Sequence, residues 1–281
     1  MEPMIDSLLD LTAEIRPRLQ PFPEGGRPQL LGCLSGACLL RDGSGQHHRS
    51  AGQVALPAGP WDLAPLIDHT LLKPEATGVQ VEVLCAEALK YGFASVCINP
   101  MWVPLAASLL KGSPVRTCTV VGFPLGASSL RAKAHEAELA VQEGAQEVDM
   151  VLAIGAAKGG DWTAVRRDLE GLRAAVPAPT VLKVILETCL LTDGEKEQAS
   201  TLALEAGLDF VKTSTGFSTG GATEADVALM RRVVGTGMGV KASGGIRTYE
   251  GALAMVLAGA TRLGLSASVA VVQGGAGAGT Y

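Results

Sequence analysis

Residues 208–217 read L-D-F-V-K-T-S-T-G-F. An apolar run through Phe210 and Val211 ends at Lys212, and a turn of hydroxyl-bearing residues and glycine follows. This pattern is typical of the end of a buried strand, since such strands are short, apolar and bounded by turn-forming residues. Lysine is strongly hydrated and is rarely buried without a partner. Lys212 is therefore either half of a structural ion pair or a reactive amine at the end of a strand.

Similar apolar runs recur along the chain, at a spacing of roughly 25–35 residues that suits a strand-loop-helix-loop unit. They span residues 63–69, 93–99, 115–123, 146–152, 180–188, 238–243 and 261–266. Alanine- and leucine-rich stretches with helical spacing lie between them, as at 127–143, 162–175 and 222–234. Strands that alternate with helices predict a parallel sheet covered by helices. Eight such strands predict an α/β fold of the closed (β/α)8 TIM-barrel type. No G-x-G-x-x-G opens a helix after the first strand, which counts against a dinucleotide-binding sheet.

The two ends of the chain fall outside this rhythm. Residues 1–60 are rich in proline, glycine and polar residues, and we expect an N-terminal extension, partly helical over about 5–16 and otherwise loosely ordered. The barrel is expected over 61–275, and a flexible C-terminal tail over 276–281. Tyr281 ends that tail. It either belongs to a disordered terminus or folds back over the barrel mouth to relay a proton.

Composition narrows the class of protein. The chain has 281 residues, 47% of them apolar, and a net charge of −5 without a lysine/arginine run, so nucleic acid is not an expected partner. No stretch reaches 18 apolar residues, so no membrane span is expected. The six cysteines form no C-x-x-C pair and the four histidines lack zinc-site spacing. We therefore expect buried thiols in a cytoplasmic protein, and no metal site.

Four consecutive predicted strands carry a charged residue late in the apolar run. These residues are Asp149, Lys183, Lys212 and Lys241. Functional groups of a barrel gather where its strands end, and burying three lysines beside one carboxylate for structure alone would cost several kcal/mol. Adjacent strands lie about 4.8 Å apart, so Lys241 can approach Lys212 and disfavour its ammonium form. A neutral amine attacks carbonyls, so Lys212 is predicted to form an imine.

Glycine-rich loops follow the last two predicted strands. Ser243-Gly244-Gly245 precedes a helix expected near Thr248, and Gly264-Leu265-Ser266-Ala267-Ser268 leads into the last helix. Glycines that expose backbone N–H groups at these two loops are typical of the phosphate site of a TIM barrel. The sequence therefore predicts a phosphorylated ligand.

Eight motifs in order resemble the deoxyribose-phosphate aldolase family, which forms imines with its substrate. They are I-D-H-T-L-L-K-P (67–74), V-C-I-N-P (96–100), V-V-G-F-P-L-G (120–126), V-D-M-V (148–151), L-K-V-I-L-E-T (182–188), V-K-T-S-T-G-F (211–217), V-K-A-S-G-G-I-R-T (240–248) and V-Q-G-G (272–275). The resemblance implies reversible cleavage of 2-deoxy-D-ribose 5-phosphate to acetaldehyde and D-glyceraldehyde 3-phosphate. It implies no cofactor, because the imine itself accepts electrons.

The same resemblance assigns roles to residues. Lys212 would form the Schiff base, Lys241 would perturb it, and Asp149 would be the acid/base. The residues implied to bind substrate are Asp68, Cys97, Lys183, Thr213, Gly216, Gly244, Gly245, Gly264, Ser266 and Ser268. The family loop G-T-S-S-G here reads G-L-S-A-S, so Leu265 and Ala267 replace hydroxyl residues. Phosphate affinity is then reduced, or shifted to Ser266, Ser268 and backbone amides.

Three other functions stay open at this point. One is a transaldolase-like, imine-forming barrel that acts on a larger ketose phosphate. Another is a pyridoxal-phosphate-binding barrel, which pairs a lysine with a phosphate site in the same way. The third is a non-catalytic scaffold, which the presence of both lysines and the aspartate disfavours. The sequence also leaves open whether the chain forms a homo-oligomer.

Overall fold

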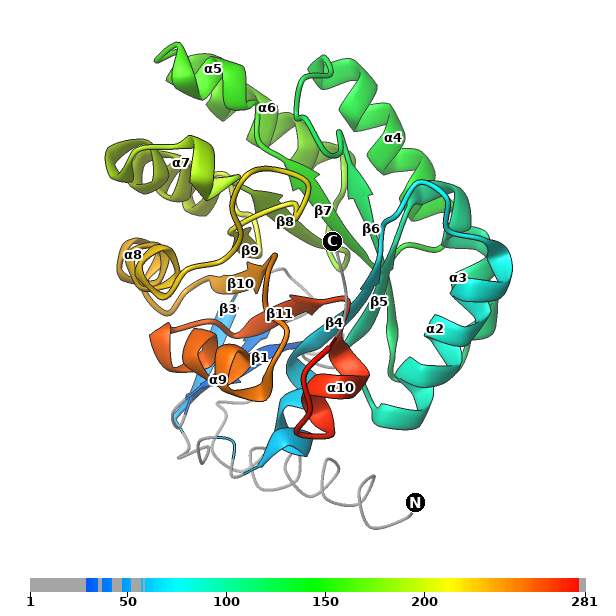
Figure 1. Ribbon diagram of the computed structural model, residues 1–281. Helices are drawn as coiled ribbons and strands as arrows, with labels where there is room; N and C mark the ends of the chain where they lie inside the picture. Colours follow the sequence, from blue (N-terminus) through cyan, green and yellow to red (C-terminus); the bar gives the residue numbers. More distant parts are fainter. Residues whose placement is uncertain (1–28, 35–36, 42–46, 52–56, 58, 278–281) are drawn as a thin grey trace.

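The computed structural model describes residues 29–34, 37–41, 47–51, 57 and 59–277. Eight parallel strands close into a barrel in the order β10-β11-β4-β5-β6-β7-β8-β9, which confirms the predicted fold (Figure 1). The strands are β4 (Ile67–Leu71), β5 (Ser95–Ile98), β6 (Arg116–Val121), β7 (Glu147–Val151), β8 (Val181–Ile185), β9 (Phe210–Lys212), β10 (Gly239–Ser243) and β11 (Arg262–Leu265).

Helices surround this barrel (Figure 1). They are α2 (Gly78–Tyr91), α3 (Val103–Leu109), α4 (Leu130–Gln142), α5 (Ile154–Lys158), α6 (Trp162–Ala175), α7 (Asp193–Glu205), α8 (Glu224–Val234), α9 (Tyr249–Ala258) and α10 (Ser268–Val272). Three short 3-10 helices are η2 (Pro60–Leu66), η3 (Pro100–Trp102) and η4 (Thr188–Leu190). Hydroxyl side chains start several helices: Thr77, Thr192 and Thr248 each accept an N–H of the first turn.

The first barrel strand begins later than its apolar run predicts. Residues 63–66 belong to η2, and the strand starts at Ile67. Pro60 and Pro65 lie in η2 and have no N–H to donate, so this segment cannot enter the middle of a sheet. Its apolar side chains, Leu63 and Ala64, are buried in the main core instead.

Alternation along each strand sends side chains in two directions. One set packs outward against the helices and forms the main core. The other set points into the barrel, where Val181 and Phe210 form one small apolar cluster and Leu72, Cys97, Cys118 and Val120 form another. The barrel interior also holds the charged side chains described below.

Strands also occur in the N-terminal extension, where the sequence suggests loop. β1 (Gln29–Leu34), β2 (Ala37–Arg41) and β3 (His47–Ala51) pair antiparallel as one sheet. The loop expectation is wrong there because two apolar runs are separated only by a Ser-Gly pair, which is a hairpin signal. The helix expected over 5–16 lies outside the described residues.

Backbone contacts anchor the chain after the last helix. Ala276 forms an antiparallel bridge with Thr248, and the Gly277 N–H donates to the carbonyl of Arg247 at 3.0 Å. The chain therefore runs beside the loop that follows β10. Tyr281 lies outside the described residues. Within the described part of the chain, no helix has both the length and the apolarity needed to cross a bilayer.

Candidate active site

Two lysines and one aspartate meet inside the barrel. Lys212 and Lys241 are direct neighbours in the β9–β10 ladder, so their side chains leave the sheet side by side. The Nζ atoms of both lie 2.7 Å from Asp149 Oδ2, and all three side chains are buried. Lys212 is held at the last residue of its strand, where the loop Thr213–Phe217 begins. The geometry brings together the three residues that the sequence singles out for chemistry.

The other oxygen of Asp149 binds Lys183, which also lies inside the barrel. Lys183 Nζ is 2.8 Å from Asp149 Oδ1 and 2.5 Å from Glu147 Oε2. Asp68 also points inward, and it pairs with Lys241 and lies 3.9 Å from Lys183 Nζ. The single carboxylate assumed from the sequence is thus wrong: Asp68, Glu147 and Asp149 are all fully buried at this level.

Arg262 is a further buried cation that sequence reasoning missed. Its Nη1 lies 2.6 Å from Asp68 Oδ1 and 3.2 Å from Glu147 Oε2. The signal that could have found both Glu147 and Arg262 is strand parity. Glu147 lies two residues before Asp149 and Arg262 two before Gly264, so each shares the inward face with a residue already placed in the site.

Burial and neighbouring charges act in opposite directions on these groups. Burial favours the neutral form of Asp149, but Lys183, Lys212 and Lys241 outweigh it and hold the pKa of this carboxyl well below its usual range. Burial likewise opposes the charge of Lys241, yet Asp149 and Asp68 raise its pKa above the ordinary lysine value. The pKa of Lys183 is also raised well above that value by its carboxylate neighbours, against burial. Asp149 is therefore ionised, and its charge is stabilised by the three lysines around it.

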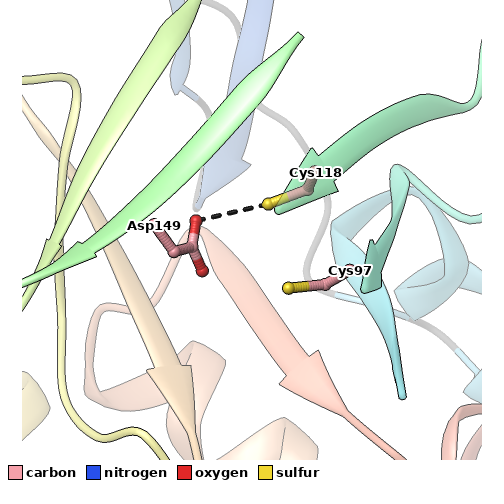
Figure 2. A group of neighbouring side chains, drawn as sticks. All are labelled: Cys97, Cys118 and Asp149. Carbon is pink, nitrogen blue, oxygen red and sulfur yellow. Dashed lines mark hydrogen bonds between the residues drawn. The ribbon is translucent and has the colours of Figure 1, made fainter. Parts of the chain in front are cut away.

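Two thiols complete the wall opposite the lysines. Cys97 and Cys118 are strand partners on β5 and β6, and they point toward Asp149 on β7 (Figure 2). The Cys118 Sγ lies 3.4 Å from Asp149 Oδ1. Two thiols and a carboxylate are a donor set that suits a soft metal ion. Here both Asp149 oxygens already bind ammonium groups, and those cations would repel a metal ion at the same place.

Loops at the carboxyl ends of the strands are tied to one another. The Thr213 hydroxyl donates to the Ser243 carbonyl at 3.0 Å and accepts the Ser243 N–H at 3.1 Å, so it is engaged by β10. The Ser243 hydroxyl donates to the Ser214 carbonyl at 2.6 Å. Gly244 also packs against the loop that follows β9, so closely that a Cβ at Gly221 would overlap the Gly244 carbonyl oxygen. These contacts fix the segment that follows Lys212.

The last loop differs from the sequence expectation. Leu265 pairs with His69 in the β11–β4 ladder, and its side chain is buried in the outer core, away from the barrel interior. Ser268 is fully buried; its hydroxyl contacts the Leu265 carbonyl and His69 Nδ1, each at 2.9 Å. The Ser268 hydroxyl is therefore engaged inside the fold, and its role in phosphate binding stays a prediction. Ser266 is exposed.

Glycines leave room at the mouth for backbone contacts. Gly216, Gly244 and Gly245 all adopt positive φ, which side-chain-bearing residues rarely do. A Cβ at Gly264 would lie 3.1 Å from the Lys241 Cε, so this glycine makes space for the lysine. The mouth of the barrel therefore exposes backbone around the two lysines.

A lysine amine that meets a carboxylate inside a barrel, at the end of a strand, is the arrangement that an imine-forming aldolase of the (β/α)8 class needs. A profile of the DeoC/LacD family of aldolases matches residues 63–278. The chain belongs to this family.

Individual relatives agree with that assignment. The deoxyribose-phosphate aldolase of Clostridium perfringens strain SM101 is 57% identical over 219 residues, which covers 78% of this chain and 98% of the relative. That of Streptococcus sanguinis strain SK36 is 58% identical over 217 residues, covering 76% and 97%. Among solved structures, the deoxyribose phosphate aldolase of Aeropyrum pernix is 38% identical with a TM-score of 0.73, covering 78% of this chain and 92% of that one.

Proposed function

We propose that this chain is a class I aldolase that reversibly cleaves 2-deoxy-D-ribose 5-phosphate to acetaldehyde and D-glyceraldehyde 3-phosphate. The observation that carries the proposal is the shared contact of Lys212 and Lys241 with one oxygen of Asp149, each at 2.7 Å. The amine that is to attack the carbonyl thus lies against both a carboxylate and a second cation. The names of the relatives supply the substrate.

In the synthetic direction, the neutral Nζ of Lys212 adds to the carbonyl carbon of acetaldehyde. The carbinolamine loses water to give an imine, and Asp149 then takes a proton from the methyl carbon to form the enamine. The enamine carbon attacks the aldehyde carbon of D-glyceraldehyde 3-phosphate, whose oxygen takes up a proton. Water hydrolyses the resulting imine, which releases the sugar phosphate and restores the amine.

Other residues support these steps. Lys183 holds Asp149 through its second oxygen, at 2.8 Å, and Asp68 pairs with Lys241. Cys97 lines the wall opposite the lysines. We assign the acceptor phosphate to the backbone of Gly216, Gly244, Gly245 and Gly264 and to the exposed Ser266.

The test is reductive trapping. Wild-type protein treated with acetaldehyde and borohydride should gain one two-carbon unit at Lys212, located by peptide mass spectrometry. Lys212→Arg should abolish both the adduct and turnover, because arginine keeps its charge near neutral pH. Lys158→Arg, at a half-exposed lysine bound to Glu195, is the matched control and should behave as wild type. An adduct on Lys183 or Lys241 instead would refute the assignment.

A donor panel separates the remaining alternatives. Acetaldehyde as the preferred donor supports the proposal, whereas turnover only with a larger ketose phosphate indicates a transaldolase-like enzyme. An absorbance band of a lysine–pyridoxal imine in purified protein would indicate a pyridoxal-phosphate-binding barrel instead.

The setting of the enzyme is part of the proposal. Four cysteines in the described part of the chain are free thiols, which suits the reducing cytoplasm. The Aeropyrum pernix relative is described as tetrameric, and a homo-oligomer is the state we propose to test by light scattering. We also assign Tyr281 to proton relay, since Gly277, four residues before it, is anchored to the loop after β10. Deleting Tyr281 should slow proton exchange at the methyl carbon of acetaldehyde more than it changes substrate binding, and unchanged exchange would refute this.

A further inference from the structure

Seven charged side chains inside the barrel form one connected network of ion pairs. Four are cations and three are anions, and all seven are buried. The cations are Lys183, Lys212, Lys241 and Arg262, and the anions are Asp68, Glu147 and Asp149. With every group ionised, the network has an excess of one positive charge. An uncompensated charge in a buried site is costly, so the network favours losing one proton.

Lys212 is the cation with the fewest carboxylate partners in the network. Lys183, Lys241 and Arg262 each contact at least two carboxylates. Lys212 contacts only Asp149, through an oxygen that it shares with Lys241. Without the Lys212 proton, three cations face three anions and the network is neutral.

We infer that Arg262 and Glu147, neither of which touches Lys212, set the charge balance that leaves Lys212 as the neutral amine. This inference rests on the proposed imine chemistry of Lys212 and explains what prepares it. Arg262 binds Asp68, Asp68 binds Lys241, and Lys241 shares Asp149 with Lys212. Arginine suits the far end of this chain of contacts because it stays protonated at any pH at which the enzyme works. Arg262 is thus a positioning residue and not a catalytic one.

The other members keep their charges across neutral pH. Burial opposes ionisation of Asp68, Glu147 and Asp149, but the surrounding cations hold the pKa of each carboxyl below its usual range. Burial equally opposes the charges of the cations. Carboxylates nevertheless raise the pKa of Lys183, Lys241 and Arg262. The six members other than Lys212 therefore stay charged, three of them positively and three negatively.

Three further titratable side chains, Arg116, Cys97 and Cys118, border the buried network. Arg116 lies 3.8 Å from Glu147 at the edge of the network, and its side chain is 28% exposed, so it stands outside the fully buried set. The side chains of Cys97 and Cys118 share a hydrogen bond, which lowers the pKa of the Cys97 thiol against the effect of burial. Burial raises the pKa of Cys118 well above its usual value, which keeps that thiol protonated.

The test makes the net charge of the network more positive in one variant and less positive in another, and it measures the rate of imine formation in each. The rate of trapping of acetaldehyde by cyanoborohydride is measured from pH 5 to 9, with the adduct located on Lys212. Arg262→Met leaves three lysines facing three carboxylates, so the network is neutral with Lys212 protonated. The trapping rate rises with pH, and the midpoint of this rise should then move to higher pH by about one to two units. Glu147→Gln, which is isosteric, adds to the positive excess and should move the midpoint to lower pH by a similar amount.

Two controls separate charge from packing. Arg262→Lys keeps the cation and should keep the midpoint near that of wild type. The double variant Arg262→Met with Glu147→Gln restores an excess of one positive charge, so its midpoint should return toward wild type although it carries two core substitutions. Lys241→Leu also removes one cation and should shift the midpoint to higher pH. Thermal melts verify that each variant is folded, and the isosteric Glu147→Gln carries the test if Arg262→Met does not fold.

The outcomes distinguish this inference from the proposed function. Shifts of the same sign in Arg262→Met and Glu147→Gln, an unmoved Glu147→Gln midpoint, or a double variant that does not return toward wild type would overturn the charge-balance inference. The proposed function still stands in those cases if wild-type protein is trapped at Lys212. A wild-type protein that is not trapped there refutes the proposed function itself.

Discussion

Replacing Glu187 should destabilise the loop that follows Lys212, and the size of the effect can be worked out from its contacts. Glu187 follows β8 with φ 56° and ψ 62°, and it is the one non-glycine residue with positive φ in the described part of the chain. Its buried carboxylate accepts the Thr215 N–H at 3.3 Å and the Thr215 hydroxyl. The carboxylate thus holds a strained backbone in place from the neighbouring loop.

Three substitutions separate the side-chain contacts from the backbone strain. Glu187→Ala loses both bonds and keeps the strain, at a cost of about 2–4 kcal/mol. Glu187→Gly also loses the bonds but relieves the left-handed conformation, and should recover about 1 kcal/mol relative to alanine. Glu187→Gln keeps an acceptor oxygen and should cost about 1 kcal/mol. The expected order of stability is wild type, glutamine, glycine and then alanine.

Thermal unfolding measures this order. One kcal/mol corresponds to about 2–4 °C for a domain of this size, so the loss of about 2–4 kcal/mol in Glu187→Ala should lower Tm by roughly 4–16 °C. Glu75→Ala, at an exposed position, is the control and should leave Tm within about 1 °C. The reasoning is refuted if Glu187→Ala has the same Tm as the wild-type protein, or if the glycine variant is no more stable than the alanine variant.

Gly239→Ala should cost about 1–3 kcal/mol in a thermal or urea melt, because its Cβ would overlap the buried Phe210 ring; an unchanged melt would contradict this. Leu265→Thr with Ala267→Ser should lower Tm and leave KM for the phosphorylated sugar unchanged, since Leu265 faces the outer core; a lower KM would show that the loop binds phosphate through these side chains. Stability should fall in acid: the three interior carboxyls have lowered folded pKa values, so their contribution is complete above the unfolded values of 3.8–4.5 and is lost as pH falls below them. A Tm that stays constant from pH 6 to pH 3 would argue against this.

Local patterns predict the barrel well because each strand and helix repeats the same unit. The runs at 146–152 and 238–243, for example, contain β7 and β10. The start of β4 was predicted too early, because the apolar residues of the 3-10 helix η2 resemble strand residues. Only its prolines show that this segment cannot join the sheet. In the N-terminal extension, proline and glycine content outweighed a hairpin signal between β1 and β2.

Some residues of the site can be predicted only from the face of the strand on which they lie. Lys212, Lys241 and Asp149 were predictable because each charge stands late in an apolar run. Glu147 and Arg262 stand at strand starts, where a charge is commonplace, and only parity places them inside the barrel. The contact of Glu187 with Thr215 joins two loops that follow different strands. No pattern within one segment could have predicted it.

The order of the interior charges along the chain divides the barrel into two dissimilar halves. All three interior carboxylates come from the half β4–β7, and all four interior cations come from β8–β11. Two copies of either half would place like charges against one another in a buried interior, whereas the two different halves neutralise each other. If the chain were expressed as two separate fragments, each would therefore reject its own copy and select the other fragment. Electrostatics would make reassembly of a split barrel heterodimeric.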